Sequence, residues 1–174
     1  LFFLKIMRKI LTPYRQNKFK KTLDEYEIRT TYKRGKNYLF DEAIRIPLLF
    51  IGAGIEQSRI INDLVRHVDI FPTIFEFVEL PMTNSSIDGK SCGSTYRGIE
   101  SDELPAYIES ASKDPKKSGA VIGIRTSNYK YFRSRYDPKK NVNLYDLQKD
   151  PKEEHNILNA ELIKKMEEKL SYFI

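Results

Sequence analysis

Two β-rich runs separated by a three-residue turn constrain the fold of this chain more than any other feature. The runs are residues 120–125 and 129–133, with Thr126, Ser127 and Asn128 between them. A connection this short predicts a hairpin of two neighbouring antiparallel strands. A second turn sequence follows at residues 137–141, and a third strand-like run covers 142–147. The C-terminal part of the chain is therefore predicted to contain an antiparallel sheet.

The C-terminal end of the chain has the pattern of an amphipathic helix. From Asn159 onward, apolar residues are spaced by one, three and four positions, which places them on one helical face. These apolar residues are Leu162, Ile163, Met166, Leu170 and Phe173. The charged residues of the opposite face, predicted to be solvated, are Lys164, Glu167, Glu168 and Lys169. We expect this helix to cover the antiparallel sheet.

The middle of the chain shows an alternating α/β pattern. Residues 46–51 form a nearly continuous apolar run, bounded by Pro47 and Gly52. Such a run is typical of a strand buried on both faces in a parallel sheet. Residues 106–110 alternate like another strand. The predicted fold class is α/β, with a few strands of a mainly parallel sheet followed by the C-terminal antiparallel sheet and its helix.

A helix is predicted between the apolar run and the C-terminal sheet. Asp69 or a neighbour opens it, and Pro72 falls in its first turn, where a missing N–H costs nothing. The helix is expected to end before Pro81. Its predicted buried face consists of Ile70, Ile74, Phe77 and Val78.

Composition describes a soluble protein large enough to bury a core. The chain has 174 residues, of which 40% are hydrophobic and 31% are charged. The apolar opening, residues 1–4, is far too short for a membrane span or a secretory signal. Residues 5–28 allow two short amphipathic helices broken around Pro13. The net charge of +6 is distributed along the whole chain, which favours a solvated surface over a nucleic-acid-binding stripe.

A block in the first third of the chain combines a lone lysine with an acidic pair, an arginine and a proline. Lys36 precedes Pro47 by eleven positions, and Asp41, Glu42 and Arg45 lie between them. This block resembles a stretch of the sulfatases, in the alkaline-phosphatase-like superfamily, whose lysine contacts the sulfate group. Four later segments also resemble sulfatase motifs and keep their order: residues 67–74, 80–91, 124–131 and 144–156. Five matches in order indicate the C-terminal portion of a sulfatase.

The resemblance implies a division of the chain and roles for two residues. It makes residues 33–104 the C-terminal part of the sulfatase α/β core and 105–174 an antiparallel-sheet subdomain with a terminal helix. The basic residues 1–32 are expected to be helical, and no role is assigned to them. Lys36 is the implied catalytic cation, which contacts a sulfate oxygen and supports the leaving ester oxygen. His67 is most simply a polar cap near the predicted helix, and substrate binding is its alternative role. The implied substrate is a sulfate-ester small molecule or glycan.

The resemblance does not extend to the sulfatase nucleophile and metal ligands. Sulfatases use as nucleophile a cysteine in a C-x-P-S-R context that is oxidised to formylglycine. They hold a divalent cation with an Asp-Asp pair and an Asp-His or Asp-Asn pair. Cys92, the only cysteine, lacks the proline, and Arg97 follows it one position too late. Asp24 lies near the expected place of an Asp-His-Gly metal motif, but Glu25 and Tyr26 replace His-Gly. We therefore assign no metal ligand or cofactor to this chain, and expect formylglycine and a divalent cation, calcium, only in a complete parent enzyme.

Other polar residues of these segments are predicted to be structural. Glu42 and Arg45 flank the entry to the apolar run, where an ion pair between them would fix the loop that carries Lys36. His155 and Asn156 are expected to pack against the last helix. Cys92 is expected to be a small apolar side chain in a loop.

Two other classes of function compete with the hydrolase. The first is a non-catalytic protein that keeps the sulfatase fold and binds sulfated or phosphorylated ligands. The second is a basic module whose residues 129–136 stack on single-stranded nucleic acid. Aromatic residues at positions 129, 131 and 132 do not share one strand face, so packing in a hairpin explains them better. We expect no nucleic-acid or membrane partner, and we expect this chain alone to be inactive.

Overall fold

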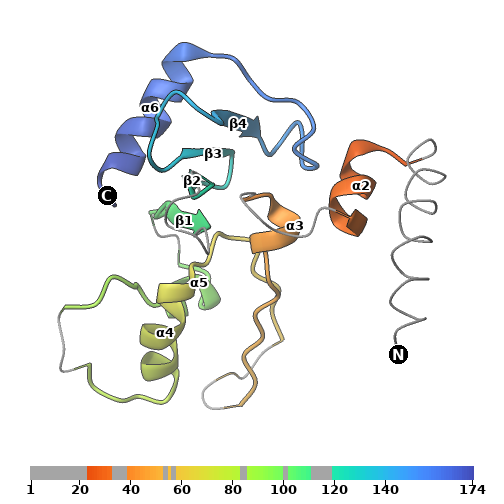
Figure 1. The fold of residues 1–174 in the computed structure, drawn as a ribbon. Helices are drawn as coiled ribbons and strands as arrows, with labels where there is room; N and C mark the ends of the chain where they lie inside the picture. The colour runs from red at the N-terminus through yellow and green to blue at the C-terminus, as the bar shows by residue number, and fades with distance from the viewer. Residues whose placement is uncertain are drawn as a thin grey trace, which may run out of the picture.

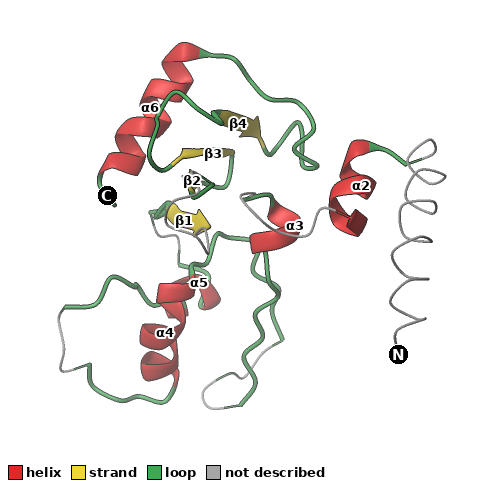
Figure 2. Cartoon of the chain, in the orientation of Figure 1, coloured by secondary structure: helices red, strands yellow, loops and turns green. Residues whose placement is uncertain are grey.

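The computed structural model describes residues 23–32, 39–52, 55, 58–82, 86–99, 102–110 and 119–174. Its central element is a four-stranded antiparallel sheet with the strand order β1-β2-β3-β4 (Figure 1). The strands are β1 (Ala106–Ser110), β2 (Val121–Arg125), β3 (Tyr129–Ser134) and β4 (Asn143–Asp146). Helices and long loops surround this sheet (Figure 2). The predicted C-terminal antiparallel sheet is therefore confirmed.

The β2–β3 hairpin turns at the three residues that the sequence indicated. The Thr126 amide donates to the Tyr129 carbonyl at 2.8 Å, and the Tyr129 amide donates to Thr126 Oγ1 at 3.0 Å. The hairpin register places Ile124 opposite Tyr131, and the next strand pair places Tyr131 opposite Leu144. Because side chains alternate along each strand, these residues share one face of the sheet.

Helix α6 (Ala160–Ser171) covers that face. Asn159 caps it, since its side chain accepts a hydrogen bond of 3.0 Å from the Leu162 amide. The core beneath α6 consists of Ile122, Ile124, Tyr131, Leu144, Met166 and Leu170. The terminal helix and its apolar face are therefore confirmed. Its charged face differs from expectation at Glu167, which bonds to Tyr131 and Arg133 instead of facing solvent.

A small truncation in this core tests the packing under α6. Ile124 is fully buried and Ile60 is 88% exposed, so the same substitution at the two positions differs mainly in burial. We expect Ile124→Val to lower the free energy of unfolding by about 0.5–1.5 kcal/mol, because it removes a buried methylene group. Ile60→Val should change it little. Urea unfolding of both variants, followed by circular dichroism, makes the measurement, and equal effects would contradict the assigned core.

The opposite face of the sheet is covered by the chain around α3 (Asp41–Ile44). Leu39 and Phe40 pack there against Val121, Phe132 and Tyr145. The Phe40 and Phe132 rings meet edge to face, with centroids 5.5 Å apart. Tyr131 and Phe132 are thus both buried, on opposite faces, and their rings are not available for stacking on bases. Hairpin packing accounts for the aromatic residues of this segment.

The segment before β1 contains the predicted helix. The 3₁₀ helix η1 (His67–Asp69) leads into α4 (Ile70–Phe77), and the short helix α5 (Gly93–Tyr96) lies beside α4. Asp69 is the residue that precedes α4, and the helix ends before Pro81, as predicted. The buried face was predicted wrongly, because Pro72 and Thr73 are buried while Ile74 and Val78 are exposed. Burial on α4 depends on which side of the helix faces α5 and the preceding loop. The spacing of the apolar residues in the sequence does not indicate which side that is.

The expected buried parallel strand at residues 46–51 is wrong. These residues have no regular secondary structure, and Leu49 and Ile51 are 78% and 85% exposed. A strand of a parallel sheet needs neighbouring strands and a covering layer on each face. No described strand pairs with residues 46–51, so the four described strands form one antiparallel sheet only. The apolar pattern therefore indicates an environment that the described part of the chain does not supply.

The N-terminal prediction is tested only at its end. Helix α2 (Glu25–Tyr32) overlaps the last residues of the expected helical segment, and residues 5–22 lie outside the described part. Among the described residues, no helix has the length and apolar character needed to cross a membrane.

Candidate functional site

The predicted catalytic residue Lys36 lies outside the described residues, but the chain on each side of it is described. Arg29 in α2 precedes it, and Asp41 in α3 follows it. Both bond to Glu153, which comes after β4: Arg29 Nη1 donates to the Glu153 carbonyl at 2.7 Å, and the Asp41 amide donates to Glu153 Oε2 at 2.7 Å. One residue of the C-terminal segment therefore anchors both flanks of residues 33–38.

A buried group of charges fixes Asp41. Lys130, on β3, is fully buried, and its Nζ lies 2.5 Å from Asp41 Oδ1 and 2.7 Å from Glu153 Oε1. Arg125, on β2, donates to the two oxygens of the Asp41 carboxylate at 3.1 and 3.0 Å. This bidentate geometry is the strong form of an arginine–carboxylate pair. We call Asp41, Arg125, Lys130 and Glu153 the Asp41 cluster.

The Asp41 cluster joins three of the sequence segments singled out above. Asp41 belongs to the block that follows Lys36, Arg125 and Lys130 belong to residues 124–131, and Glu153 belongs to residues 144–156. Sequence reasoning assigned no role to any of these four residues. A signal was present, because Arg125 and Lys130 are cations in strand runs that are mostly apolar, where a charge is costly unless it is paired. Their partners could not be read from the sequence.

Burial and pairing act in opposite directions on the carboxylates of the cluster. Burial favours the neutral form of Asp41, but the Arg125 hydrogen bonds and the Lys130 ammonium outweigh it and lower the pKa of Asp41 to about 2. Burial raises the pKa of Glu153, and the charge of Lys130 offsets this only in part. Asp41 is therefore the ionised anchor of the cluster at neutral pH.

The lowered pKa of Asp41 predicts a loss of stability in acid. The ordinary value is 3.8 and the folded value about 2, so the stability that ionised Asp41 contributes is present above pH 3.8 and lost as the pH falls towards 2. Glu153, whose pKa is raised, acts in the opposite sense, because its contribution is lost as the pH rises through its folded pKa. We expect Asp41→Asn to flatten the pH dependence of unfolding between pH 2 and 4. Urea unfolding at several pH values tests this, and a slope equal to that of the native chain would contradict it.

Arg29 attaches α2 to the same region. Its guanidinium lies 3.9 Å from the centroid of the Phe40 ring and donates to the carbonyls of Lys152 and Glu153. Arg29 Nε also donates to Glu42 Oε1 at 2.9 Å. The predicted pairing of Glu42 with Arg45 is therefore wrong. Glu42 pairs with a residue of α2 because that residue is buried beside it, whereas Arg45 is exposed.

His67 is exposed at the start of η1, and no contact among the described residues joins it to the Asp41 cluster. Its neighbour Asp69 makes the structural contacts. The Asp69 carboxylate accepts hydrogen bonds from the Arg66 side chain at 2.7 and 3.0 Å and from the Lys90 amide at 2.9 Å. Burial opposes ionisation of Asp69, but these bonds lower its pKa below the ordinary value. Asp69 thus fixes the loop around Lys90 to the beginning of α4.

The same loop packs closely against α4 through small residues. A Cβ atom at Gly89 would overlap the Val68 carbonyl, so only glycine fits at this position. The Cys92 amide donates to Thr73 Oγ1 at 3.0 Å, and Cys92 Sγ lies 3.0 Å from the same oxygen. Cys92 is therefore a packed loop residue that contacts α4, and the interpretation as a structural side chain agrees with this geometry.

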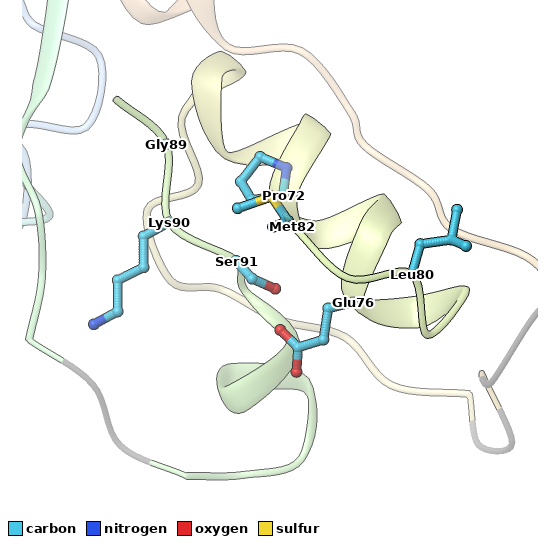
Figure 3. A pocket seen from close by; sticks show the side chains of 7 residues that line it. All are labelled: Pro72, Glu76, Leu80, Met82, Gly89, Lys90 and Ser91. Carbon is cyan, nitrogen blue, oxygen red and sulfur yellow. The ribbon is translucent and has the colours of Figure 1, made fainter. Parts of the chain in front are cut away.

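A hollow of about 450 Å³ lies between α4 and this loop (Figure 3). Its lining residues are Pro72, Glu76, Leu80, Met82, Gly89, Lys90 and Ser91. Figure 3 shows the Lys90 side chain pointing away from Glu76 and Ser91. Glu76 is paired with Arg97. The only cation among the lining residues therefore points away from the one carboxylate, and the lining offers no cluster of cations for a sulfate group.

The tail residues His155 and Asn156 were expected to pack against the last helix, but Asn156 bonds to the chain of β4 and His155 is exposed. Asn156 Oδ1 accepts a hydrogen bond from the Leu144 amide at 2.9 Å, and Asn156 Nδ2 donates to the Val142 carbonyl at 3.0 Å. His155 is exposed, and its amide donates to Asp150 at 2.7 Å. These bonds fix the segment between Glu153 and α6 to the turn that follows β4.

The described residues do not fit the metal centre that a sulfatase needs. In the described part of the chain, no group of three or more histidine, cysteine, aspartate or glutamate side chains is arranged to hold a metal ion. The acidic residues of the Asp41 cluster are already neutralised by Lys130 and Arg125. The described residues therefore offer anchoring contacts for the Lys36 segment, and no metal site.

Two features together characterise this protein. They are an antiparallel sheet covered by a C-terminal helix, and sulfatase-like segments that the buried Asp41 cluster joins. Residues 32–173 match the family described as N-sulphoglucosamine sulphohydrolase, C-terminal. This match covers most of the chain, and the chain belongs to that family.

Individual proteins similar to this chain include two sulfatases and a solved structure. The extracellular sulfatase SULF-1 homolog of Drosophila melanogaster is 36% identical over 58 residues, which are 33% of this chain and 5% of that protein. Arylsulfatase K of Bos taurus is 24% identical over 136 residues, which are 75% of this chain and 25% of that protein. A candidate sulfatase from Bacteroides fragilis superposes with a TM-score of 0.50 at 22% identity, over 60% of this chain and 23% of that one. The chain thus spans a quarter or less of the length of these relatives.

Proposed function

We propose that this chain forms the C-terminal portion of a sulfuric ester hydrolase in which Lys36 contacts the sulfate group. The observation that carries the proposal is the Asp41 cluster, through which three sulfatase-like segments meet and anchor the chain next to Lys36. The family match over residues 32–173 supports it. We also propose that the chain divides into the three parts predicted from its sequence, which are residues 1–32, 33–104 and 105–174.

Lysine suits the proposed role of residue 36. Its ammonium is a compact cation with three donors, and it can stabilise the charge that develops on a sulfate or ester oxygen as the S–O bond breaks. We also propose His67, which is exposed, as a residue that contacts the substrate. The proposed substrate class is a sulfate ester of a small molecule or a glycan; the name of the family supports a sulfated sugar and does not specify the ester linkage.

The remaining parts of such a site must come from a complete parent enzyme. In that enzyme we propose a formylglycine nucleophile and a divalent cation, calcium, which when bound offsets negative charge on sulfate oxygens. The described residues offer no group of ligands for the cation, and Cys92, the only cysteine of the sequence, lacks the C-x-P-S-R context. The proposed contribution of the described residues is to anchor the segment that carries Lys36.

Residues 1–174 alone are therefore expected not to hydrolyse sulfate esters. One cationic donor is worth about 2.7–4 kcal/mol in an intact site, whereas enzymes lower barriers by roughly 8–23 kcal/mol. The test is to incubate the purified chain with an aryl sulfate and calcium or magnesium, and to compare it with buffer. Metal-dependent turnover that Lys36→Ala abolishes would overturn the prediction. Turnover that Lys36→Ala leaves unchanged would identify a contaminant.

A further inference from the structure

Glu153 has an unusual backbone for a buried residue. Its φ is 55°, in the left-handed region that favours glycine. Two other described non-glycine residues, Glu79 and Asn141, also have a positive φ, but both are exposed. Glu153 is 1% exposed, so it is the one described non-glycine residue that combines this backbone with a buried side chain. Such a conformation persists only where the surrounding structure fixes it.

Four contacts fix residue 153, one for each of its polar groups. Its amide donates to the Asp150 carbonyl at 3.0 Å, and its carbonyl accepts a hydrogen bond from Arg29 Nη1 at 2.7 Å. One carboxylate oxygen lies 2.7 Å from Lys130 Nζ, and the other accepts a hydrogen bond of 2.7 Å from the Asp41 amide. The backbone of Glu153 thus holds α2, while its side chain holds β3 and α3.

The bond to Asp41 holds the beginning of α3. Asp41 is the first residue of this helix, so its amide has no acceptor within the helix. Phe40, which precedes it, provides no side-chain cap. The carboxylate of Glu153 accepts this hydrogen bond from a position 112 residues away in the sequence. It therefore does for α3 what a local N-cap residue normally does for a helix.

The backbone and the side chain of residue 153 make opposite demands on the choice of amino acid. Glycine would adopt the left-handed conformation more easily than glutamate, because it has no Cβ atom. It would also keep the amide bond to Asp150 and the carbonyl bond to Arg29. It would lose the contacts with Lys130 and Asp41, which need the carboxylate. Glutamate at this position thus sacrifices backbone stability for a connection to α3, and an unfavourable backbone of this kind points to function.

We propose that Glu153 is a positioning residue, which occupies a left-handed backbone because its carboxylate must fix the beginning of α3 while its carbonyl holds α2. Lys36 lies five residues before Asp41, so the chain reaches α3 directly from the Lys36 segment. The inference rests on the proposed function, because Lys36 is the residue whose position this contact would serve. It names the single side chain that joins the beginning of α3 to the C-terminal segment.

Hydrogen exchange at the Asp41 amide, followed by NMR on residues 1–174, tests the role of the carboxylate. Glu153→Gly removes the acceptor and should speed this exchange at least about tenfold. Glu153→Gln keeps a side-chain oxygen and should restore exchange to within about threefold of the native rate. The Ile163 amide, which bonds to the Asn159 carbonyl in α6, should exchange equally in every variant. Equal rates at Asp41 in the glycine and glutamine variants would overturn the proposal.

The stabilities of glycine and alanine variants test the backbone separately. Glu153→Gly should unfold at a higher urea concentration than Glu153→Ala, because the Cβ atom of alanine disfavours a positive φ. The order should reverse at Lys164, an exposed position within α6, where alanine is the better helix former. A Glu153→Ala variant as stable as Glu153→Gly would overturn the proposal.

Two further arrangements keep the outcomes distinct. If Glu153→Gly does not fold, Glu153→Met replaces it in the exchange measurement, since methionine has a similar length and no carboxylate. The readouts are amide exchange and unfolding, and neither depends on hydrolysis. A complete parent enzyme whose turnover survives Lys36→Ala would therefore reject the proposed function without changing the result for Glu153.

Discussion

Lys130→Met is expected to lower the free energy of unfolding by about 3–5 kcal/mol, because it removes from the buried Asp41 cluster the cation that pairs with Glu153. Lys130 Nζ is fully buried and lies 2.5 Å from Asp41 and 2.7 Å from Glu153. Glu153 is itself only 1% exposed, so its charge would be left without compensation in an apolar surrounding. A loss of this size is a large fraction of the stability of a small domain. Urea unfolding, extrapolated to water, measures it.

Lys164→Met is the matched control, since Lys164 is an exposed lysine of α6. Its effect should be within about 0.5 kcal/mol of zero. If Lys130→Met leaves too little folded protein to measure, the double variant Lys130→Met with Glu153→Gln provides the test. Removing both charges should restore at least about 1 kcal/mol, because the penalty arises from the unpaired carboxylate. A double variant less stable than Lys130→Met would show that the cluster is not the source of the loss.

The antiparallel sheet and α6 could be predicted because their signals are local. Only three residues separate β2 from β3, and the Asn159 cap and the spacing of Met166 and Leu170 mark the helix. The positions of Asp69 and Pro72 similarly marked the beginning of α4. In each case, neighbours in the sequence are also neighbours in space, so the pattern contains the information.

The Asp41 cluster could not be predicted for the opposite reason. Asp41 is 84 residues from Arg125 and 112 residues from Glu153. No local spacing relates such residues, and the choice of Arg45 as the partner of Glu42 followed from proximity in sequence alone. Residues 46–51 illustrate a second limit. Their apolar pattern indicates the surroundings that they require, and it contains no information on whether the same chain supplies them.

Arg29→Met is expected to destabilise the fold by about 3 kcal/mol and to release α2 from the C-terminal segment, because buried hydrogen-bond acceptors lose a charged donor. Arg29 is 8% exposed and donates to the carbonyls of Lys152 and Glu153 and to the Glu42 carboxylate. Methionine keeps much of the contact with Phe40 and removes the donors. Arg29→Lys should recover only part of the loss, because a single ammonium cannot match the planar fork of a guanidinium. Urea unfolding compares the variants, with Arg135→Met as an exposed arginine control.

The losses of stability predicted for Arg29→Met and Lys130→Met should not be additive. Arg29 bonds to the Glu153 carbonyl and Lys130 pairs with the Glu153 carboxylate, so both substitutions release the same residue. Once Lys130 is absent, the Glu153 side chain has lost its ion pair, so less of the local structure remains for Arg29 to stabilise. The double variant should therefore retain about 0.5–3 kcal/mol more stability than the sum of the single losses predicts. Arg29→Met combined with Ile124→Val, which shares no partner with Arg29, should be additive within about 0.5 kcal/mol. Full additivity of Arg29 and Lys130 would mean that Glu153 does not join the two flanks of the Lys36 segment, and the proposed anchoring would fail with it.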